Sequence, residues 1–287
     1  MSNAKGDLLR VAVTQWQAGR NLHANLRSAE EMIDNCGRQG AEVVLLPENG
    51  LFLGGNAEMR SAALDSDGEE IGALRHAALR ARVVVVMGGF KRRGADGNIF
   101  NTALVIDGHG DVACGYDKIH LFDASVGGRT LAASSVESPG ETPLIIQIKG
   151  IKIGVTICYD VRFPELYRQL ALHGAQVILV PSAFTYLTGS AHWEVLLRAR
   201  AIENGAFVVA SATIRDPCDA DAVQTYGHAL VVEPWGQVVA DLGEASTAYR
   251  VVPLDMQRVC EARASLPVLR HVRPSAYTKS PRLVVVS

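Results

Sequence analysis

The alternation of short apolar runs with segments of helical periodicity is the feature that most narrows the folds open to this sequence. The apolar runs are rich in Val and Ile, and most are bounded by Gly, Pro, Asp or Asn, as β-strands are. Several, such as VVLL, VVVVM and VILV, are continuously apolar, which is typical of central strands covered on both faces. Strands are predicted at residues 9–15, 42–46, 82–90, 101–107, 111–116, 144–148, 152–157, 175–180, 207–213, 229–233, 237–241 and 247–252.

The helical segments are fewer. From residue 22 to residue 36, apolar residues recur at steps of three and four, and Gly40 follows as a stop signal. Pro164 suits the first turn of a helix, where its missing N–H leaves no hydrogen bond unmade. Four further helices are predicted at 69–81, 164–173, 191–204 and 255–264.

Turn sequences at 107–110, 149–151 and 234–236 join neighbouring strands as hairpins. Hairpins mixed with helical crossovers predict a mixed sheet or two sheets covered by helices, in the order helix, sheet, sheet, helix. No Pro-, Gly- or Ser-rich stretch is long enough to act as a linker, so residues 1–287 are expected to form a single α/β domain. Residues 1–6 are expected to be disordered or a remnant of cloning.

Composition excludes several classes of protein. With 28 Lys and Arg against 30 Asp and Glu, the formal charge of −2 gives no electrostatic reason to bind nucleic acid or an acidic membrane. No apolar run approaches the roughly 20 residues of a membrane span, and MSNAKGDLLR lacks the apolar core of a signal peptide. The absence of GxxxxGK, GxGxxG and HExxH leaves nucleotide and zinc chemistry without support, so no cofactor and no metal is expected.

The cysteines are odd in number and dispersed, which is typical of reduced thiols in a cytoplasmic protein. Most are expected to be small buried apolar residues. The five are Cys36, Cys114, Cys158, Cys218 and Cys260.

Cys158 is set apart by its surroundings. It ends the apolar strand at 152–157, and a short polar turn separates it from the helix that begins at Pro164. A nucleophile at such a junction is held rigidly and exposed at the edge of the sheet, as in the G-x-S-x-G turn of other hydrolases. The backbone N–H groups that follow are free to stabilise an oxyanion.

A thiol nucleophile needs a base and a nearby cation. The eight histidines give no decisive pairing, but two other strand ends carry charged residues. Glu48 follows the strand at 42–46, and Lys118 follows the strand at 111–116. Because sites of α/β proteins gather outside the carboxyl ends of strands, the sequence predicts that Glu48, Lys118 and Cys158 meet as base, cation and thiol.

The segments LLPENGLF, GYDKIHLFD and GVTICYDVRFPELYR resemble the Glu, Lys and Cys motifs of the nitrilase, or carbon–nitrogen hydrolase, superfamily. The resemblance extends through PSAFTYLTGSAHWEVLLRARAIENGAFVVA and YGHALVVEPWG to LPVLRHVRP, and so covers nearly the whole chain. Tyr159 and Asp160, which follow the cysteine, resemble the residues at the same place in the amidase branches of the superfamily. The chain as a whole is most similar to deaminated-glutathione amidases and ω-amidases.

The resemblance implies an α-β-β-α sandwich of nitrilase type, usually dimeric through the helix after the nucleophile. It also implies metal-free hydrolysis of a small acidic amide through a thioester. In that mechanism Glu48 is the base, Cys158 is the nucleophile, and Lys118 with the backbone N–H of Tyr159 binds the oxyanion. Arg162, Phe184 and Thr185 follow strand ends near the nucleophile and are candidate substrate contacts. Glu194 and Arg198 have the spacing of an i,i+4 pair on a solvated face, and the alternative is that Arg198 and Arg200 line the pocket.

One segment departs from the pattern of the superfamily. Family members commonly carry a fourth residue, a glutamate, and counting from Pro139 places Ala133 at its position. Glu137 lies four residues later and is not expected to replace it. This leaves two alternatives to an amidase: hydrolysis of an N-carbamoyl compound or nitrile, and a weakly active or inactive binding protein.

Overall fold

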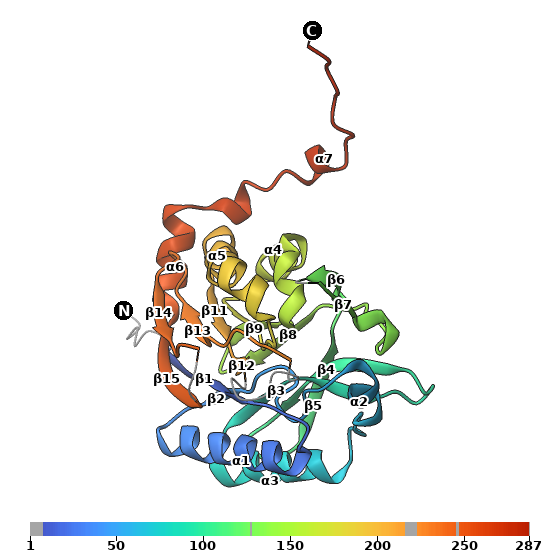
Figure 1. Ribbon diagram of the computed structural model, residues 1–287. Coiled ribbons are helices and arrows are strands. Elements are labelled where there is room, and N and C mark those ends of the chain that lie inside the picture. The colour runs from blue at the N-terminus through green and yellow to red at the C-terminus, as the bar shows by residue number, and fades with distance from the viewer. Residues whose placement is uncertain (1–7, 127, 216–222, 245–246, 287) are drawn as a thin grey trace, which may run out of the picture.

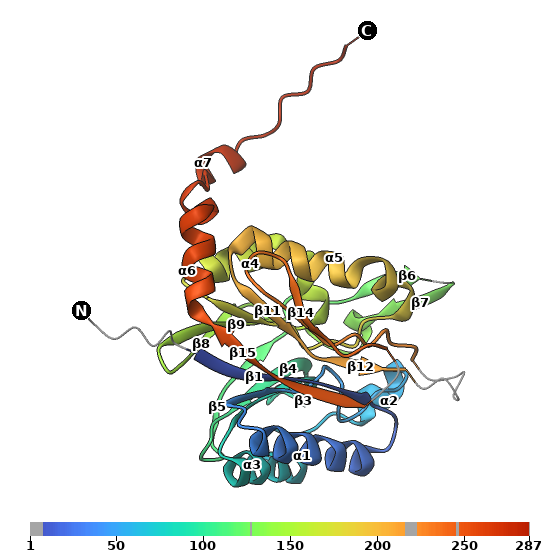
Figure 2. The same ribbon diagram turned by 90° about the vertical axis from the view of Figure 1, so that its left-hand side faces the viewer.

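Two facing β-sheets lie between two layers of helices in the computed structural model, which describes residues 8–126, 128–215, 223–244 and 247–286 (Figures 1 and 2). The predicted order of layers, helix, sheet, sheet, helix, is therefore confirmed. The predictions for residues 1–6 and for Cys218 concern positions outside the described part of the chain.

The first sheet has the strand order β12-β1-β2-β3-β4-β5, with β15 paired to β1. The pairs from β12 through β3 are parallel, and β15, β4 and β5 join in antiparallel fashion. The strands are β1 (Leu8–Gln17), β2 (Val43–Leu45), β3 (Val84–Arg93), β4 (Ile99–Ile106), β5 (Val112–Asp117), β12 (Ala212–Ile214) and β15 (Ala248–Asp255).

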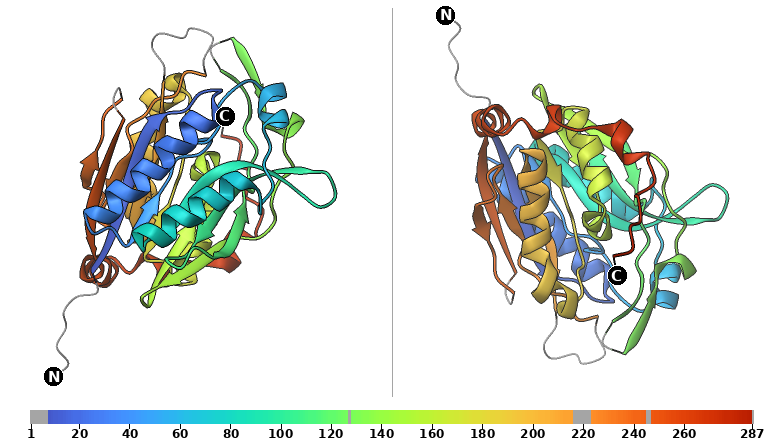
Figure 3. Two further views of the ribbon diagram at one scale, coloured as in Figure 1. Left: turned by 90° about the horizontal axis from the view of Figure 1, so that it is seen from below. Right: turned by 90° about the horizontal axis from the view of Figure 1, so that it is seen from above.

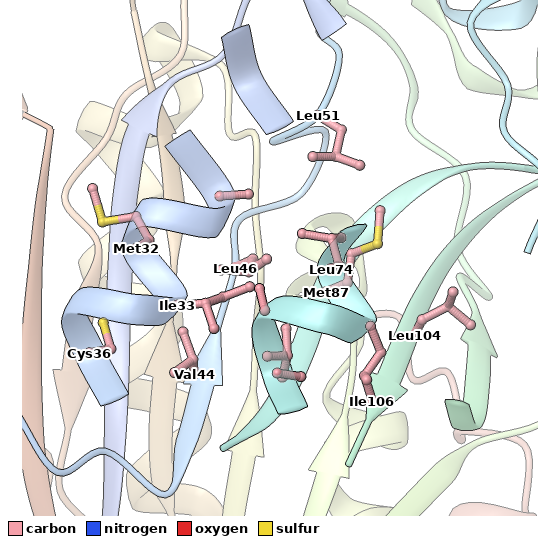
Figure 4. Close-up of a cluster of buried hydrophobic side chains, with 14 of the residues drawn as sticks. Met32, Ile33, Cys36, Val44, Leu46, Leu51, Leu74, Met87, Leu104 and Ile106 are labelled. Carbon is pink, nitrogen blue, oxygen red and sulfur yellow. The ribbon is translucent and has the colours of Figure 1, made fainter. Parts of the chain in front are cut away.

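Helices α1 (Leu22–Arg38) and α3 (Glu69–Ala81) cover the outer face of this sheet, as the view from below shows (Figure 3). Their apolar stripes pack on the strands beneath, where Ile33 and Leu74 lie among Val44 and Ile106 (Figure 4). Burial of each such branched side chain contributes roughly 1.5–3 kcal/mol.

The second sheet has the order β14-β13-β11-β10-β9-β8. Helices α4 (Pro164–Leu172) and α5 (Tyr186–Asn204) cover its outer face (Figure 3). Helix α6 (Met256–Ser265) follows β15, and η3 (Val268–Arg270) contacts α4 and α5. The chain beyond η3, with α7 (Pro274–Tyr277), projects from the body (Figure 2). The strands are β8 (Leu144–Ile148), β9 (Ile151–Val155), β10 (Val177–Leu179), β11 (Phe207–Ala210), β13 (Leu230–Val232) and β14 (Val238–Asp241).

Apolar side chains of alternate strand positions fill the space between the sheets. On β1, Val11 and Val13 face the second sheet, whereas Ala12 packs toward the helices on the other side. Val177 and Leu179 of β10 meet them from the opposite sheet. This two-sided burial explains why the central strands are continuously apolar.

The three predicted hairpins are confirmed by the pairs β4–β5, β8–β9 and β13–β14. The single strand predicted at 207–213 is wrong, because β11 and β12 belong to different sheets. Ser211 lies between them: its hydroxyl accepts from Thr14 N at 3.0 Å and donates to Leu45 O at 2.8 Å. These bonds satisfy buried backbone groups where the chain leaves one sheet for the other.

Some short elements were not predicted, because they lack a long hydrophobic period. They are α2 (Asn56–Ser61), the hairpin of β6 (Asp123–Val126) and β7 (Arg129–Ala132), η1 (Ala133–Ser135), η2 (Cys158–Arg162), η3 and α7. Helix α5 begins at Tyr186, before the predicted residue 191. Within the described residues, none of the helices combines the length and hydropathy that crossing a bilayer requires.

Candidate active site

Glu48 lies just beyond the carboxyl end of β2 and is 3% exposed. The chain there runs close against β3: Leu46 N donates to Val86 O at 2.9 Å and Asn49 N donates to Gly89 O at 2.6 Å. A side chain on Gly88 would overlap Leu46 O, so only glycine permits this approach. The close packing fixes the backbone from which the carboxylate of Glu48 projects.

Three donors hold both oxygens of the Glu48 carboxylate. Lys118 Nζ lies 2.9 Å from Oε1, and Asn101 Nδ2 donates to the same oxygen at 2.8 Å. The backbone N–H of Ala183 donates to Oε2 at 2.9 Å. Lys118 is itself 4% exposed, so the ion pair is buried and its geometry is set from three separate elements.

Cys158 begins the turn η2 and has a φ of +46°, a conformation that non-glycine residues rarely adopt. Such strain is concentrated at functional sites, where surrounding structure maintains it. Cys158 N donates to Pro181 O at 2.9 Å and Asp160 N donates to Ile157 O at 3.0 Å. Among the described residues, the N–H of Tyr159 between them has no acceptor, so it is available to a ligand at the thiol.

Asp160 fixes this turn from inside and is fully buried. Its carboxylate accepts hydrogen bonds from Tyr116 Oη at 2.7 Å, from Ile157 N at 2.9 Å and from His120 N at 3.1 Å. His120 Nδ1 lies 2.7 Å from the same carboxylate. The strand end that carries Lys118 and the turn that carries Cys158 are thereby tied together.

The charges of the site act on one another. Burial opposes ionisation of Glu48, but the ammonium groups of Lys118 and Lys91 hold its pKa below the ordinary carboxyl value. Burial likewise opposes the charge of Lys118, and the carboxylates of Glu48 and Glu137 keep the pKa of its ammonium raised. Burial and the neighbouring Glu48 raise the pKa of the Cys158 thiol. The resting site therefore holds a carboxylate, an ammonium and a neutral thiol.

A small cavity of about 20 Å³ opens onto the thiol of Cys158. The predicted substrate contacts Tyr159, Arg162, Phe184 and Thr185 line it together with Cys158, whereas Glu48 and Lys118 neighbour the thiol without lining this cavity. Thr185 also borders a neighbouring cavity of about 320 Å³, which is lined in addition by Tyr186 and Arg215.

Arg198 and Arg200 do not line these cavities. Arg200 Nε donates to Val161 O at 2.8 Å, and Arg198 Nε donates to Gly236 O at 2.9 Å. Both therefore fix the packing of α5, and the alternative that they line the pocket is wrong.

Sequence reasoning missed the donors of Asn101 and Ala183 and the role of Asp160. A polar residue at the start of the apolar run 101–107 was a usable signal for Asn101, whereas a backbone N–H such as that of Ala183 leaves no signal in residue identity. Glu137 was not expected to replace the missing glutamate. Its carboxylate is nevertheless buried, and its charge acts on Lys118.

Comparison with protein families matches residues 10–264 to the carbon-nitrogen hydrolase family. The chain is similar to the deaminated glutathione amidase of Synechocystis, with 40% identity over 91% of this chain and 97% of the relative. It is similar to the human protein of the same name, with 35% identity over 96% of this chain and 86% of the relative.

Solved structures of related proteins have the same fold as this chain. The NitFhit protein of Caenorhabditis elegans superposes with a TM-score of 0.87 at 36% identity, covering 96% of this chain and 67% of that chain. An amidase of the nitrilase superfamily from Nesterenkonia superposes with a TM-score of 0.79 at 26% identity, covering 95% and 97% of the two chains. That structure is described as carrying the acetamide moiety of fluoroacetamide covalently on its active-site cysteine.

Proposed function

This chain belongs to the carbon-nitrogen hydrolase family, and we propose that it is an amidase that hydrolyses a small acidic amide through a thioester on Cys158. The observation that carries the proposal is the geometry of Glu48. Its carboxylate is buried beside the thiol and is held at 2.9 Å by Lys118. A base, a nucleophile and a cation thus share one enclosed site.

Each step follows from these groups. Glu48 takes the proton of Cys158, and the thiolate attacks the amide carbon. The ammonium of Lys118 and the N–H of Tyr159 bind the oxyanion, where loss of one donor typically costs about 2.7–4 kcal/mol. The C–N bond breaks as protonated Glu48 gives its proton to the leaving ammonia or amine.

The thioester is then hydrolysed by the same groups in reverse roles. Glu48 takes a proton from water, the hydroxide attacks the thioester carbon, and the C–S bond breaks. The acid leaves, and the proton on Glu48 returns to the thiolate, so the enzyme regains its starting state. Because the thiol must stay reduced, the proposal requires a reducing compartment such as the cytoplasm.

Arg162 supports an acidic substrate. Its guanidinium lies 5.0 Å from the ring centre of Phe184 and 5.7 Å from that of Tyr159, at the wall of the cavity over Cys158. Its hydrogen-bond partner is His192 Nδ1 at 3.3 Å, and no carboxylate of the described residues pairs with it. A cation held by aromatic rings is suited to bind the carboxylate of a substrate.

Release of ammonia or of the free amine from deaminated glutathione, α-ketoglutaramate, an N-carbamoyl amino acid and a nitrile tests the proposal directly. We expect turnover of an acidic amide, with complete loss in Cys158→Ala and full retention in Cys260→Ala, which changes an exposed cysteine. Mass spectrometry of enzyme quenched during turnover should show an acyl adduct on Cys158. Normal activity of Cys158→Ala would overturn the mechanism, and carbon dioxide release from the carbamoyl compound alone would favour that alternative activity.

A wild-type protein that turns over none of these compounds and shows no selective alkylation of Cys158 would favour the non-enzymatic alternative. Ala133 is the observation behind that alternative, since it lies half-buried in η1 where family members commonly have a glutamate. If Ala133 limits turnover, Ala133→Glu should raise kcat.

We further propose that the protein forms a homodimer or higher homo-oligomer through the outer helical layer. Leu187, Val195 and Ile202 are exposed along α5, and Trp235 is exposed in the β13–β14 turn, whose Gly236 lies against Ile202. Sedimentation should give the mass of at least a dimer for wild type and of a monomer for Val195→Glu. A dimer that survives Val195→Glu and Ile202→Glu together would contradict this interface, and Leu79→Glu, on the opposite layer, is the matched control.

A further inference from the structure

A second buried ion pair lies beside the pair of Glu48 and Lys118. Lys91 of β3 is paired with Glu137, which follows η1, and their side chains are only 10% and 2% exposed. Neither residue touches the cavity over Cys158. Burial of two charges can cost more free energy than their pairing returns, so this pair calls for an explanation beyond packing.

The backbone brings the second pair to the first. Lys91 is the register partner of Asn101 across β3 and β4, and Lys118 N donates to Asn101 O at 2.8 Å. Lys91 of β3, Asn101 of β4 and Lys118, directly after the end of β5, therefore form one row across the sheet. Two members of the row, Asn101 and Lys118, hold Glu48, and the third holds Glu137.

The segment that carries Glu137 is fixed to the same strand ends. Ser138 N donates to Ile99 O at 2.7 Å, and Gly140 N donates to Lys118 O at 2.8 Å. A side chain on Gly140 would overlap the carbonyl oxygen of Asp117, so glycine is required for this approach. The segment thus holds Glu137 close to the strand end that carries Lys118.

We propose that Lys91 and Glu137 are positioning residues, an inference that rests on the function proposed above. Their buried ion pair keeps the charges of Glu48 and Lys118 in balance. It thereby sets the pH range in which Glu48 can accept the proton of Cys158. The four groups contain two carboxylates and two ammoniums. The ammonium of Lys91 attracts the carboxylate of Glu48, and the carboxylate of Glu137 attracts the ammonium of Lys118. The pair of Lys91 and Glu137 therefore stabilises the charged forms of both Glu48 and Lys118.

The other charged groups near the row are paired among themselves. Arg92, next to Lys91, pairs with Asp117 at 2.9 Å on the opposite face of the sheet. Asp160 is occupied by Tyr116 and His120 behind the nucleophile turn. The groups that act on Glu48 and Lys118 are therefore the charges of Lys91 and Glu137, together with the neutral thiol of Cys158.

The first test is the pH dependence of Cys158 alkylation by iodoacetamide, which requires no turnover. Lys91→Met removes a cation and should move the midpoint of alkylation up by about one pH unit, whereas Glu137→Gln removes an anion and should move it down by a similar amount. If the ion pair had only a structural role, losing either partner would disturb the site in the same way, and both midpoints would shift in the same direction. Shifts in the same direction, or no shift in folded variants, would overturn the proposal.

The exchanged variant Lys91→Glu/Glu137→Lys covers the case in which a lone buried charge prevents folding. It keeps an ion pair but reverses its polarity, so Glu48 faces an anion and Lys118 faces a cation. The proposal expects the pH window of kcat/KM to narrow from both ends, by about tenfold in proton concentration at each. If the exchanged variant folds and its pH window of kcat/KM is unchanged, only the presence of an ion pair matters and not its polarity. That result would overturn the proposal.

Arg92→Met is the matched control, because it breaks the neighbouring ion pair on the other face of the same strand. It should leave both pH profiles where they are in wild type. If the protein turns over no amide at all, the proposed function fails, while the alkylation shifts still decide the charge balance.

Discussion

Gly89→Ala tests whether Asn101 is needed to hold the catalytic base. A Cβ on Gly89 would overlap Asn101 Oδ1 and would lie 3.1 Å from both Asn101 Cγ and Ile157 Cγ2. The φ of Gly89 is not positive, so alanine brings no backbone strain and its effect is purely one of space. The carboxamide of Asn101 must turn away, and its 2.8 Å bond to Glu48 cannot survive the movement.

The size of the effect follows from the bond that is lost. A hydrogen bond to a charged group is worth about 1.5–3 kcal/mol, which corresponds to a loss of roughly 10- to 150-fold in kcat/KM if the bond is needed in the transition state. Ammonia release measures that loss. Thermal unfolding measures the separate cost of overpacking, which is typically about 1–3 kcal/mol.

A double-mutant cycle with Asn101→Ala isolates the cause. If Gly89→Ala acts through Asn101, it should add no further loss of activity once Asn101 is alanine, because the carboxamide that it displaces is gone. Gly72→Ala is the control, since it adds a methyl in open space on α3 and should stabilise the helix by about 0.5–1 kcal/mol without changing activity. Wild-type activity of Gly89→Ala, or strictly additive losses in the cycle, would refute the reasoning.

Three further outcomes are expected. Lys118→Met should lower kcat by about 100- to 1,000-fold through loss of an oxyanion donor. In urea, its free energy of unfolding should fall by about 3–5 kcal/mol because Glu48 is left buried without its partner. Activity near wild type would contradict the role of Lys118 as an oxyanion donor. Asp160→Ala should lower the free energy of unfolding by at least about 3 kcal/mol in urea, because several buried donors lose their acceptor, and a change below about 1 kcal/mol would contradict that role. The pKa of Glu48 is lowered in the fold, so its ionised form contributes stability that is present above the ordinary carboxyl pKa and is lost as the pH falls through the lower folded value. The urea midpoint of Glu48→Gln should therefore fall less steeply below about pH 4.5 than that of wild type. Equal slopes in the two proteins would argue against this contribution of Glu48.

The main elements of the fold follow from local patterns, and the exceptions have physical causes. The continuously apolar runs predicted the central strands, because burial on both faces of a sheet demands apolar residues at every position. The run 207–213 shows the limit of that rule. Both sheets are equally apolar inside, so nothing in the composition of the run reveals that Ser211 carries the chain from one sheet to the other.

The candidate site shows a similar division. Glu48, Lys118 and Cys158 were predictable because each follows a strand end, where α/β proteins place their chemistry. Glu137 was discounted by its position in the sequence, since it lies four residues from the place expected for a glutamate. Its role depends instead on Lys91, which is distant in the chain and reaches it only through the register of β3 and β4.

The arrangement of donors also explains why the site lies where the two sheets converge. Glu48 and Lys118 extend from strands of the first sheet, whereas Cys158 and the N–H of Ala183 belong to segments that follow strands of the second. The bond from Ala183 N to Glu48 therefore ties the base, which the first sheet carries, to a segment of the second sheet, the sheet that also carries the nucleophile. A shift of one sheet against the other would lengthen this bond before it exposed much apolar surface, and activity should consequently be lost at lower urea concentration than the far-ultraviolet circular dichroism of the sheets.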